Sequence, residues 1–165
     1  MERRPITDPF DILQKEHEEV LSRLQELEDA VTSITGKGFT GESFSHIARV
    51  IRYFGTDFKK HDRGEEKVLF PLIEAHVAGS TAPYRSEHRQ LWSAFDRLQR
   101  SVQDVEMSKV HGSTIREIVE ASRAIIDLLR GHVAKEDGEL FPLAKKVFSE
   151  EDYIRLHLIS HFNER

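Results

Sequence analysis

The sequence contains one eleven-residue pattern twice, and this duplication constrains the fold more than any other feature. The pattern is H-x-x-x-E-[ED]-x-x-L-F-P, and it occupies His61–Pro71 and, 71 residues later, His132–Pro142. The same offset relates Glu16-His17 to Glu87-His88. Three apolar landmarks follow it without insertion: Leu27 to Leu98, Val31 to Val102 and Ile47 to Ile118. The chain is therefore expected to hold two copies of a two-helix unit, each with one His followed by a His and a Glu.

Apolar residues recur at spacings of three and four throughout both copies, which predicts amphipathic helices. Four such stripes joined by short links predict an all-α fold, an up-down-up-down four-helix bundle over residues 8–148, with a short fifth helix over residues 149–162. We expect a single domain spanning residues 1–165, because this length is typical of one domain. Residues 1–7 are expected to form a loose tail.

Several residues mark the expected helix ends. Asp8 and Ser43 are predicted to cap the first and second helices, and Ser149–Asp152 to form a capping box for the fifth. The first connection is expected around three glycines, at positions 36, 38 and 41. Pro71 should end or bend the second helix, because it has no N–H and its ring crowds a carbonyl in the preceding turn.

The composition excludes several functional classes. The net charge is −5 and no basic block occurs, so nucleic acid is not an expected partner. No cysteine is present, which excludes disulfides, thiolate nucleophiles and cysteine-based zinc sites. No apolar run approaches the roughly 20 residues that a membrane span requires, and no apolar segment of a leader follows the basic start. A soluble, cytoplasmic protein without a membrane partner is expected.

Six polar residues interrupt the apolar stripes near their middle. They are His17, His61, Glu65, His88, His132 and Glu136. Burying an unpaired carboxylate costs several kcal/mol, and neither Lys nor Arg lies on the stripes to pair with these two. A bound cation would pair with both carboxylates and accept neutral imidazoles as ligands. Hydrogen-bonded His–Glu core pairs without metal are the alternative. Iron suits an open His/carboxylate set without thiolates, while manganese or zinc could also occupy it.

Other polar residues near these six are open to two interpretations. Glu66 and Asp137 are interpreted as carboxylates that face solvent or contact a metal-binding residue, or else as alternative ligands. Tyr84 is interpreted as a core aromatic or as a phenol that reaches the metals. Glu16 and Glu87 are expected on a solvated face.

The remaining histidines give only a weak signal. His157 and His161 share a helix face and form a weak candidate for a second metal site. The other three, His46, His76 and His111, are expected at the surface.

Together, the residue set H…H-x-x-x-E…H…H-x-x-x-E, with L-F-P after each pair, resembles the hemerythrin-like HHE cation-binding domain. The resemblance implies a non-haem di-iron centre, with an oxo or hydroxo bridge, in a four-helix bundle. It implies the four histidines as terminal ligands and Glu65 and Glu136 as bridges between the irons.

The pattern differs from that of oxygen-carrying hemerythrins at two positions. Those have H-x-x-x-H on the third helix, where Tyr84 stands four residues before His88, and an Asp ligand five after the last His, where Glu136 stands four after His132. The set is more similar to bacterial hemerythrin-like proteins linked to iron–sulfur repair and to nitric oxide or peroxide stress.

The expected function is therefore binding of two irons that react with or sense oxygen, nitric oxide or peroxide. Iron storage, iron sensing or iron donation to damaged clusters is the alternative. A purely structural metal in a bundle with a partner-binding outer face is a third hypothesis.

Overall fold

The computed structural model describes the backbone of residues 8–163 and the side chains of residues 8–158. The predicted tail, residues 1–7, lies outside the described residues. The first and third long helices are α1 (Pro9–Lys37) and α5 (Ala82–Glu106). The second is a continuous run of α2 (Gly41–Tyr53), η1 (Phe54–Phe58), α3 (Lys59–Gly64), η2 (Glu65–Leu69) and α4 (Phe70–Glu74). The fourth is a run of α6 (Gly112–Lys135), η3 (Glu136–Leu140) and α7 (Phe141–Val147), and α8 (Glu150–Asn163) follows.

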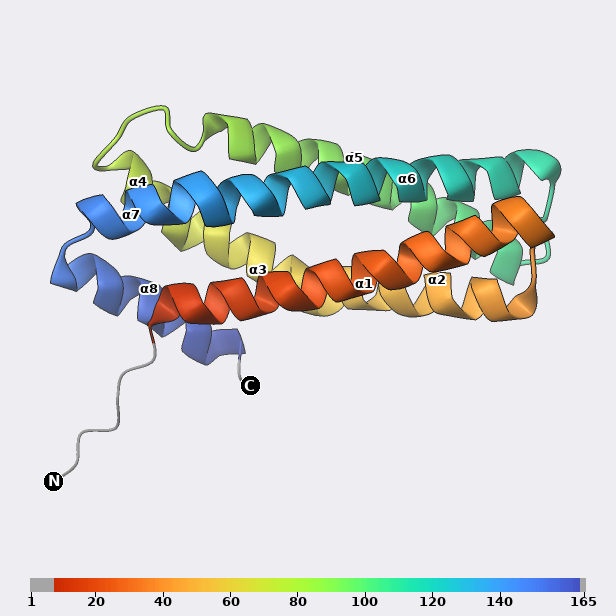
Figure 1. Ribbon diagram of the computed structural model, residues 1–165, viewed down its shortest axis with the longest axis horizontal. Helices are drawn as coiled ribbons and strands as arrows, with labels where there is room; N and C mark the ends of the chain where they lie inside the picture. Colours follow the sequence, from red (N-terminus) through yellow and green to blue (C-terminus); the bar gives the residue numbers. More distant parts are fainter. Residues whose placement is uncertain (1–7, 164–165) are drawn as a thin grey trace, which may run out of the picture.

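The four long helices run alternately up and down and form the predicted bundle (Figure 1). The links from α1 to α2 and from α5 to α6 lie at one end, and the link from α4 to α5 lies at the other. The short helix α8 turns back at this second end and packs against α1. The all-α class and the short fifth helix are thus as predicted from the sequence, and no strand occurs among residues 8–163.

The helix starts follow local hydrogen bonding, with one correction. The Phe10 N–H donates to Asp8 Oδ1 at 2.9 Å, so Asp8 caps α1 as predicted. The prediction that Ser43 caps the second helix is wrong. Thr40 is the cap, its Oγ1 accepts from the Ser43 N–H at 3.2 Å, and its own N–H donates back to Ser43 Oγ at 3.2 Å. Ser43 therefore occupies the third helical position of a capping box.

The link between α1 and α2 is shorter than expected from the glycines at positions 36, 38 and 41. Gly36 is inside α1, and the chain leaves the helix at Gly38, whose φ of 87° is a conformation that other residues adopt only at a cost. At the start of α8, Ser149 and Asp152 form the predicted reciprocal pair. The Ser149 N–H donates to Asp152 Oδ2 at 2.9 Å, and the Asp152 N–H donates to Ser149 Oγ at 3.2 Å.

Both L-F-P motifs follow a turn of π-helix. The Phe70 N–H donates to the Glu65 carbonyl, five residues back, and the Phe141 N–H donates to the Glu136 carbonyl in the same way. A wider turn gives the following proline ring room that a regular α-turn would not, since that ring crowds the carbonyl four residues earlier. The second helix ends at Glu74, close to Pro71 as expected, whereas the fourth passes Pro142 and continues to Val147.

The buried apolar residues form two clusters, one on each side of a polar layer. The larger cluster fills the bundle towards the α1–α2 turn and includes Phe54, Phe58 and Phe95. The smaller one lies beneath α8 and includes Phe10, Phe70 and Phe141. All six residues singled out in the sequence lie between the two clusters along their helices. The core therefore consists of two apolar clusters with a layer of buried His and Glu side chains between them.

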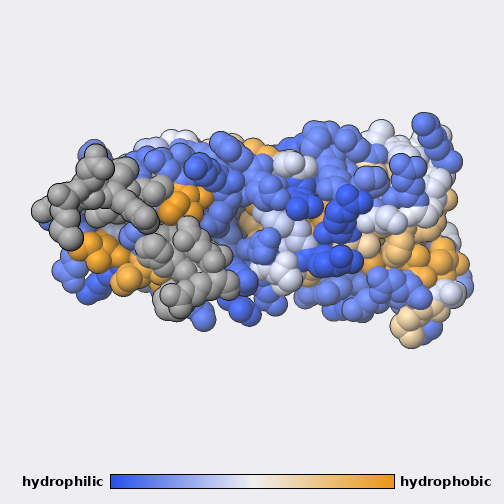
Figure 2. Space-filling model, turned by 90° about the horizontal axis from the view of Figure 1, so that it is seen from below, coloured by the Kyte–Doolittle hydropathy of each residue, from blue (hydrophilic) through white to orange (hydrophobic). Residues whose placement is uncertain are grey.

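The face of the bundle that is seen from below is mostly polar (Figure 2). Hydrophilic side chains cover most of it, and apolar ones show mainly near the two ends. Within the described residues, no helix has both the length and the apolar character to cross a bilayer. The apolar side chains are thus directed inward, as the sequence stripes indicated.

Leu24→Ala should test the larger apolar cluster. Leu24 is fully buried, so its truncation should lower the free energy of unfolding by about 2–5 kcal/mol through lost burial and a cavity. Leu21→Ala is the matched control on the same helix, because Leu21 is 40 % exposed and should change stability by about 0.5 kcal/mol or less. Urea unfolding of both variants measures the difference, and equal losses would contradict this assignment of the core.

Candidate metal centre

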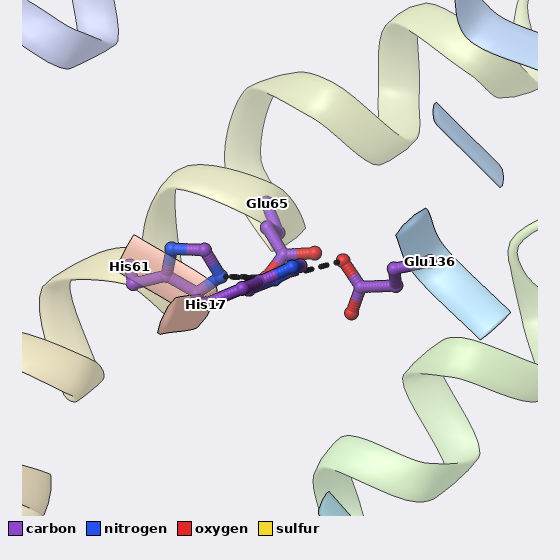
Figure 3. Close-up of side chains that lie close together, drawn as sticks. All are labelled: His17, His61, Glu65 and Glu136. Atoms are coloured by element: carbon purple, nitrogen blue, oxygen red, sulfur yellow. Dashed lines mark hydrogen bonds and ion pairs between the residues drawn. The ribbon is translucent and has the colours of Figure 1, made fainter. Parts of the chain in front are cut away.

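The structure brings the six predicted residues together in two groups that share both glutamates. One group is His17, His61, Glu65 and Glu136, and the other is Glu65, His88, His132 and Glu136. In each group, one potential ligand atom per residue lies within 4.8 Å of all the others. Each of the six residues is at most 3 % exposed. In the first group, the side chains converge from three separate helices (Figure 3). Metal ligation by them stays a prediction, but the convergence on which it depends is present.

Helix geometry explains the convergence. His61 and Glu65 are four residues apart and share a helix face, and His61 Nε2 lies 2.5 Å from Glu65 Oε1. The antiparallel arrangement of neighbouring helices places His17 Nε2 3.2 Å from His61 Nε2, and His88 Nε2 3.1 Å from His132 Nε2. These four histidines thus direct their Nε2 atoms towards the interior of the bundle.

Glu16 and Glu87 hold two of these histidines from a neighbouring helix. Glu16 Oε2 accepts from His61 Nδ1 at 2.6 Å, and Glu87 Oε2 accepts from His132 Nδ1 at 3.0 Å. The expectation of a solvated face is therefore wrong for both, and their side chains are only 27 % and 13 % exposed. The signal was present in the sequence, since an acid precedes the His in both copies. Only the packing shows that each acid contacts a histidine on another helix, and not the histidine that follows it in the sequence.

Asp137 and Glu66 hold the other two histidines, and they do so across the two halves. Asp137 Oδ1 accepts from His17 Nδ1 at 2.8 Å, and Glu66 Oε1 accepts from His88 Nδ1 at 2.7 Å. The sequence left two interpretations open for Asp137 and Glu66. The structure shows that each contacts a histidine that is a candidate metal ligand. Each carboxylate fixes the ring orientation of its histidine and raises the basicity of the opposite nitrogen.

When the imidazoles are neutral and both glutamates are ionised, which is the form that would bind a metal, these contacts leave the centre with acceptors and no donors. A carboxylate only accepts, so each Nδ1 carries the proton and the Nε2 of a neutral imidazole presents a lone pair to its neighbour. Both carboxylate oxygens of Glu65 and of Glu136 are buried without a hydrogen-bond partner among the described residues. Facing lone pairs about 3 Å apart in an apolar core need a cation between them. The donor set, imidazole nitrogens and carboxylate oxygens without thiolates, fits a pair of iron ions.

Aromatic rings enclose the centre, and two of them come from the L-F-P motifs. Phe141 stacks on His17 with centroids 5.3 Å apart, and Phe70 stacks on His88 at 5.4 Å. Phe58 stacks on His61 at 5.6 Å. The repeated phenylalanines, whose role the sequence did not reveal, therefore keep water away from the imidazoles.

Tyr84 packs edge-on against His132, with ring centroids 5.7 Å apart, but its hydroxyl is bonded elsewhere. Tyr84 is buried, and its hydroxyl donates to the Lys135 carbonyl at 3.4 Å, so it is a core aromatic rather than a phenol directed at the metals. Of the histidines predicted at the surface, His76 and His111 are exposed and His46 is partly exposed. For the weak candidate site on α8, the side chain of His161 lies outside the described residues, so that site stays a prediction.

Burial and charge shift the titration of the metal-free centre. Burial and the charge of Glu136 raise the pKa of Glu65 well above 4.5. Glu136 shows the opposite direction: although burial alone would raise its pKa, the adjacent side chains of Glu65 and His132 lower it. Burial alone would also lower the pKa values of His61 and His132, but their glutamate partners raise both above 6.5. Without metal, Glu65, His61 and His132 therefore retain protons that a cation would displace.

The structure adds a residue that the sequence did not indicate, Asp62. It is only 3 % exposed, and Trp92 Nε1 donates to its Oδ2 at 2.7 Å. Its Oδ1 lies 3.4 Å from His88 Nε2, and burial raises its pKa. Asp62 fills a variable position of the repeated pattern, so motif spacing alone could not single it out. Trp92 is half-buried and donates to this carboxylate, while Phe95 is buried.

Comparison with known proteins agrees with this geometry. The model of the hemerythrin HHE cation-binding domain family matches residues 8–144, which include all six residues of the centre. The chain belongs to this family. Two curated relatives are similar to its hemerythrin domain at 26 % identity. One is the iron-sulfur cluster repair protein YtfE of Cronobacter sakazakii, matched over 59 % of this chain and 46 % of the relative. The other is the zinc finger protein BRUTUS of Arabidopsis thaliana, matched over 61 % of this chain and 8 % of the relative.

The chain thus spans less than half the length of either curated relative. No solved structure matches it. These comparisons identify the hemerythrin domain and leave the activity of the whole relatives as a matter for proposal.

Glu16→Ala should weaken metal binding although Glu16 is not a predicted ligand. Loss of its hydrogen bond frees the His61 ring, and removal of such a partner typically costs about 10–100-fold in metal affinity. Glu18→Ala is the matched control, because Glu18 is exposed two residues away. Competition with a chelator measures both affinities, and an unchanged affinity in Glu16→Ala would show that the hydrogen bond is not needed.

The stability of the metal-free hemerythrin domain should fall as pH rises. The raised pKa values of Glu65, His61 and His132 mean that the folded chain binds these protons more tightly than the unfolded chain. Their contribution to stability is complete below the unfolded pKa values and is lost as pH rises through the folded ones. The lowered pKa of Glu136 acts in the opposite sense but only in more acidic solution, below its unfolded pKa near 4.5.

Thermal unfolding of metal-free protein from about pH 6 to about pH 8.5 measures this effect, since His titrates near 6.5 when unperturbed. Tm should decrease over this range, and bound metal should remove the decrease because it replaces the protons. The variant Glu65→Gln should show a smaller slope than the parent. A flat profile in the metal-free parent would contradict the raised pKa values.

Proposed function

We propose that this hemerythrin domain binds two iron ions and uses them to react with or to sense a small molecule, either oxygen, nitric oxide or peroxide. The observation that carries the proposal is the set of facing acceptors. Two unpartnered carboxylates and four imidazole Nε2 atoms meet in an apolar core, with no Lys or Arg among the described residues paired to Glu65 or Glu136. A bound cation would pair with every member of this set at once, which supports metal binding.

The two groups would hold one ion each. His17 and His61 belong to one group, His88 and His132 belong to the other, and Glu65 and Glu136 belong to both and would bridge. Glu16, Glu66, Glu87 and Asp137 keep the Nδ1 protons in place, so each Nε2 stays available as a lone-pair ligand. When bound in the ferrous state, the irons would supply electrons to a small oxidant.

The surroundings of the centre support a small ligand. Phe58, Phe70 and Phe141 stack on three of the four histidines, and apolar clusters lie on both sides of the polar layer. Such walls exclude bulk water and leave little room for a large or strongly hydrated substrate. A diatomic molecule or peroxide fits these walls.

Iron storage, sensing or donation is a second candidate, supported by a different observation. One relative carries the name of an iron–sulfur cluster repair protein, and the match covers 59 % of this chain. In that case the function would be to bind iron reversibly and release it. The two candidates share the metal centre and differ in whether the bound iron leaves it.

The double variant Glu65→Ala plus Glu136→Ala tests the metal centre. It removes both residues shared by the two groups, so bound iron should fall from two ions per chain to none, measured by iron analysis after anaerobic loading. Glu18→Ala plus Glu139→Ala is the control, because both acids are exposed and should leave two irons bound. A Glu65/Glu136 double variant that retains two irons would disprove the ligand assignment.

The visible spectrum of the anaerobically loaded protein distinguishes the two candidates. Exposure to oxygen, nitric oxide or peroxide should produce a new absorption band while both irons stay bound. Iron that instead passes to a chelator or to an iron-depleted cluster protein, without a band, would favour storage or donation. A band that bleaches when oxygen is removed indicates reversible binding, and a band that persists indicates redox chemistry.

A further inference from the structure

Trp92 is the only tryptophan in the chain, and it lies between the protein surface and the centre. Its side chain is half-buried and lines a groove of about 570 Å³ between the second and third long helices. His88 lines the same groove, although its side chain is only 4 % exposed. The indole is therefore within reach of molecules in solution and close to a candidate metal ligand.

Two short contacts connect Trp92 to the histidines of the centre. The Trp92 ring lies 6.2 Å from the ring of Phe58, centroid to centroid, and Phe58 stacks on His61 at 5.6 Å. Trp92 Nε1 also donates to Asp62 Oδ2 at 2.7 Å, and Asp62 Oδ1 lies 3.4 Å from His88 Nε2. Because the rate of electron transfer falls exponentially with distance, these contacts favour transfer of an electron from the indole to the centre.

The hydrogen bond to Asp62 also favours loss of an electron from the indole. Oδ2 is the acceptor, so the negative charge on this oxygen faces the indole and stabilises a positive charge on the ring. Asp62 is only 3 % exposed, so water screens this contact little. Arg63 and Arg89 line the same groove, but both are exposed, so solvent weakens their repulsion of the ring.

The duplication does not account for this arrangement. The offset of 71 residues places Leu21 at the position of Trp92, and Leu129 at the position of Phe58. Leu21 is 40 % exposed and Leu129 is buried. A leucine side chain is saturated and does not act as an electron donor. The oxidisable ring and the phenylalanine that bridges it to His61 therefore require an explanation of their own.

Tyr84 is a second oxidisable ring near the centre, but its contacts suit electron donation less well. It packs edge-on against His132, with ring centroids 5.7 Å apart. A phenol loses an electron readily only when a base accepts its proton. The Tyr84 hydroxyl donates to the backbone carbonyl of Lys135, which is not such a base. An indole can lose an electron and keep its N–H proton, so Trp92 is the better donor.

We propose that Trp92 is a redox-active residue that supplies an electron to the metal centre and recovers it from a reductant in the groove. The inference rests on the proposed binding of iron and its reaction with peroxide. Peroxide needs two electrons to become water, and a centre with one ferrous ion supplies only one. Trp92 supplies the other: Fe²⁺, Trp92, H₂O₂ and two protons give Fe³⁺, the Trp92 cation radical and two water molecules. The O–O bond is thus cleaved without release of a hydroxyl radical.

The groove favours an anionic one-electron reductant. Arg63 and Arg89 form no ion pair among the residues whose side chains are described, and one exposed acid of the groove, Asp96, is likewise unpaired. Exposed positive charges attract small anions. Ascorbate is such an anion and serves as the probe. It gives one electron to the Trp92 cation radical, releases one proton and becomes the ascorbyl radical.

The test uses the full chain, loaded anaerobically with one ferrous ion per chain and mixed with peroxide. A radical should appear in the EPR spectrum of rapidly frozen samples, and ring-deuterated tryptophan should narrow its signal, which distinguishes it from a tyrosine radical. Without reductant, the cation radical should pass a second electron to Fe³⁺, lose two protons and take an oxygen atom from water. The peptide that contains Trp92 should then be heavier by one oxygen atom in a mass spectrum. Ascorbate added before peroxide should prevent this gain.

Three controls accompany the test. In zinc-loaded protein, peroxide should leave Trp92 unmodified, because zinc supplies no electron. Trp92→Phe should bind iron but lose the radical signal, and Tyr84→Phe should keep it. Circular dichroism and iron analysis establish that each variant folds and is loaded. Should Trp92→Phe not fold, ring deuteration and the mass spectrum of the parent chain still test the proposal.

Several results would overturn the proposal. A signal that ring deuteration does not narrow, or that persists in Trp92→Phe, would place the radical on another residue. Equal oxidation of Trp92 in zinc-loaded protein would show direct attack by peroxide. If the parent chain binds iron and peroxide oxidises that iron, but Trp92 gives no radical and gains no oxygen, only this inference fails. If the parent chain binds no iron, the proposed function fails with it.

Discussion

The structure depends on one constraint: hydrogen-bond acceptors face one another inside an apolar bundle. Glu65 and Glu136 have four buried oxygens without a hydrogen-bond partner in the described part of the chain, and the paired imidazoles bring their Nε2 atoms to 3.1–3.2 Å. In water such groups would be solvated, and in an apolar core they are costly. A cation removes the cost for all of them at once. The His/Glu layer therefore links folding of the chain to metal binding, and two apolar clusters exist because this layer separates them.

The carboxylates on the Nδ1 atoms connect the two repeats. Glu16 holds His61 and Glu87 holds His132, so these contacts lie within one repeat. Asp137 from the second repeat holds His17 in the first, and Glu66 from the first holds His88 in the second. Each repeat therefore orients one of its own histidines and depends on the other repeat for the second. The centre is thus a property of the assembled bundle, which explains why a two-helix unit occurs twice in one chain.

The L-F-P motif has a structural role that combines its three residues. The leucine is buried in the smaller cluster, the phenylalanine stacks on an imidazole of the other repeat, and the proline follows a widened helical turn that begins at a glutamate of the centre. Symmetry ends at Asp62, where a valine stands in the second repeat. The duplicated scaffold thus supplies two similar groups of buried His and Glu side chains.

The sequence by itself determined the fold class and the six residues of the centre. Three signals carried these predictions: helical periodicity, the 71-residue repeat, and polar residues on apolar stripes. Each can be recognised in the sequence without knowing how the helices pack. Tertiary structure alone decided which carboxylate contacts which histidine, and it placed Asp62 at the centre. Glu16 contacts His61, 45 residues away, and Asp137 contacts His17, 120 residues away. Such pairings depend on the rotation of each helix about its axis, which the packing of all four helices sets together.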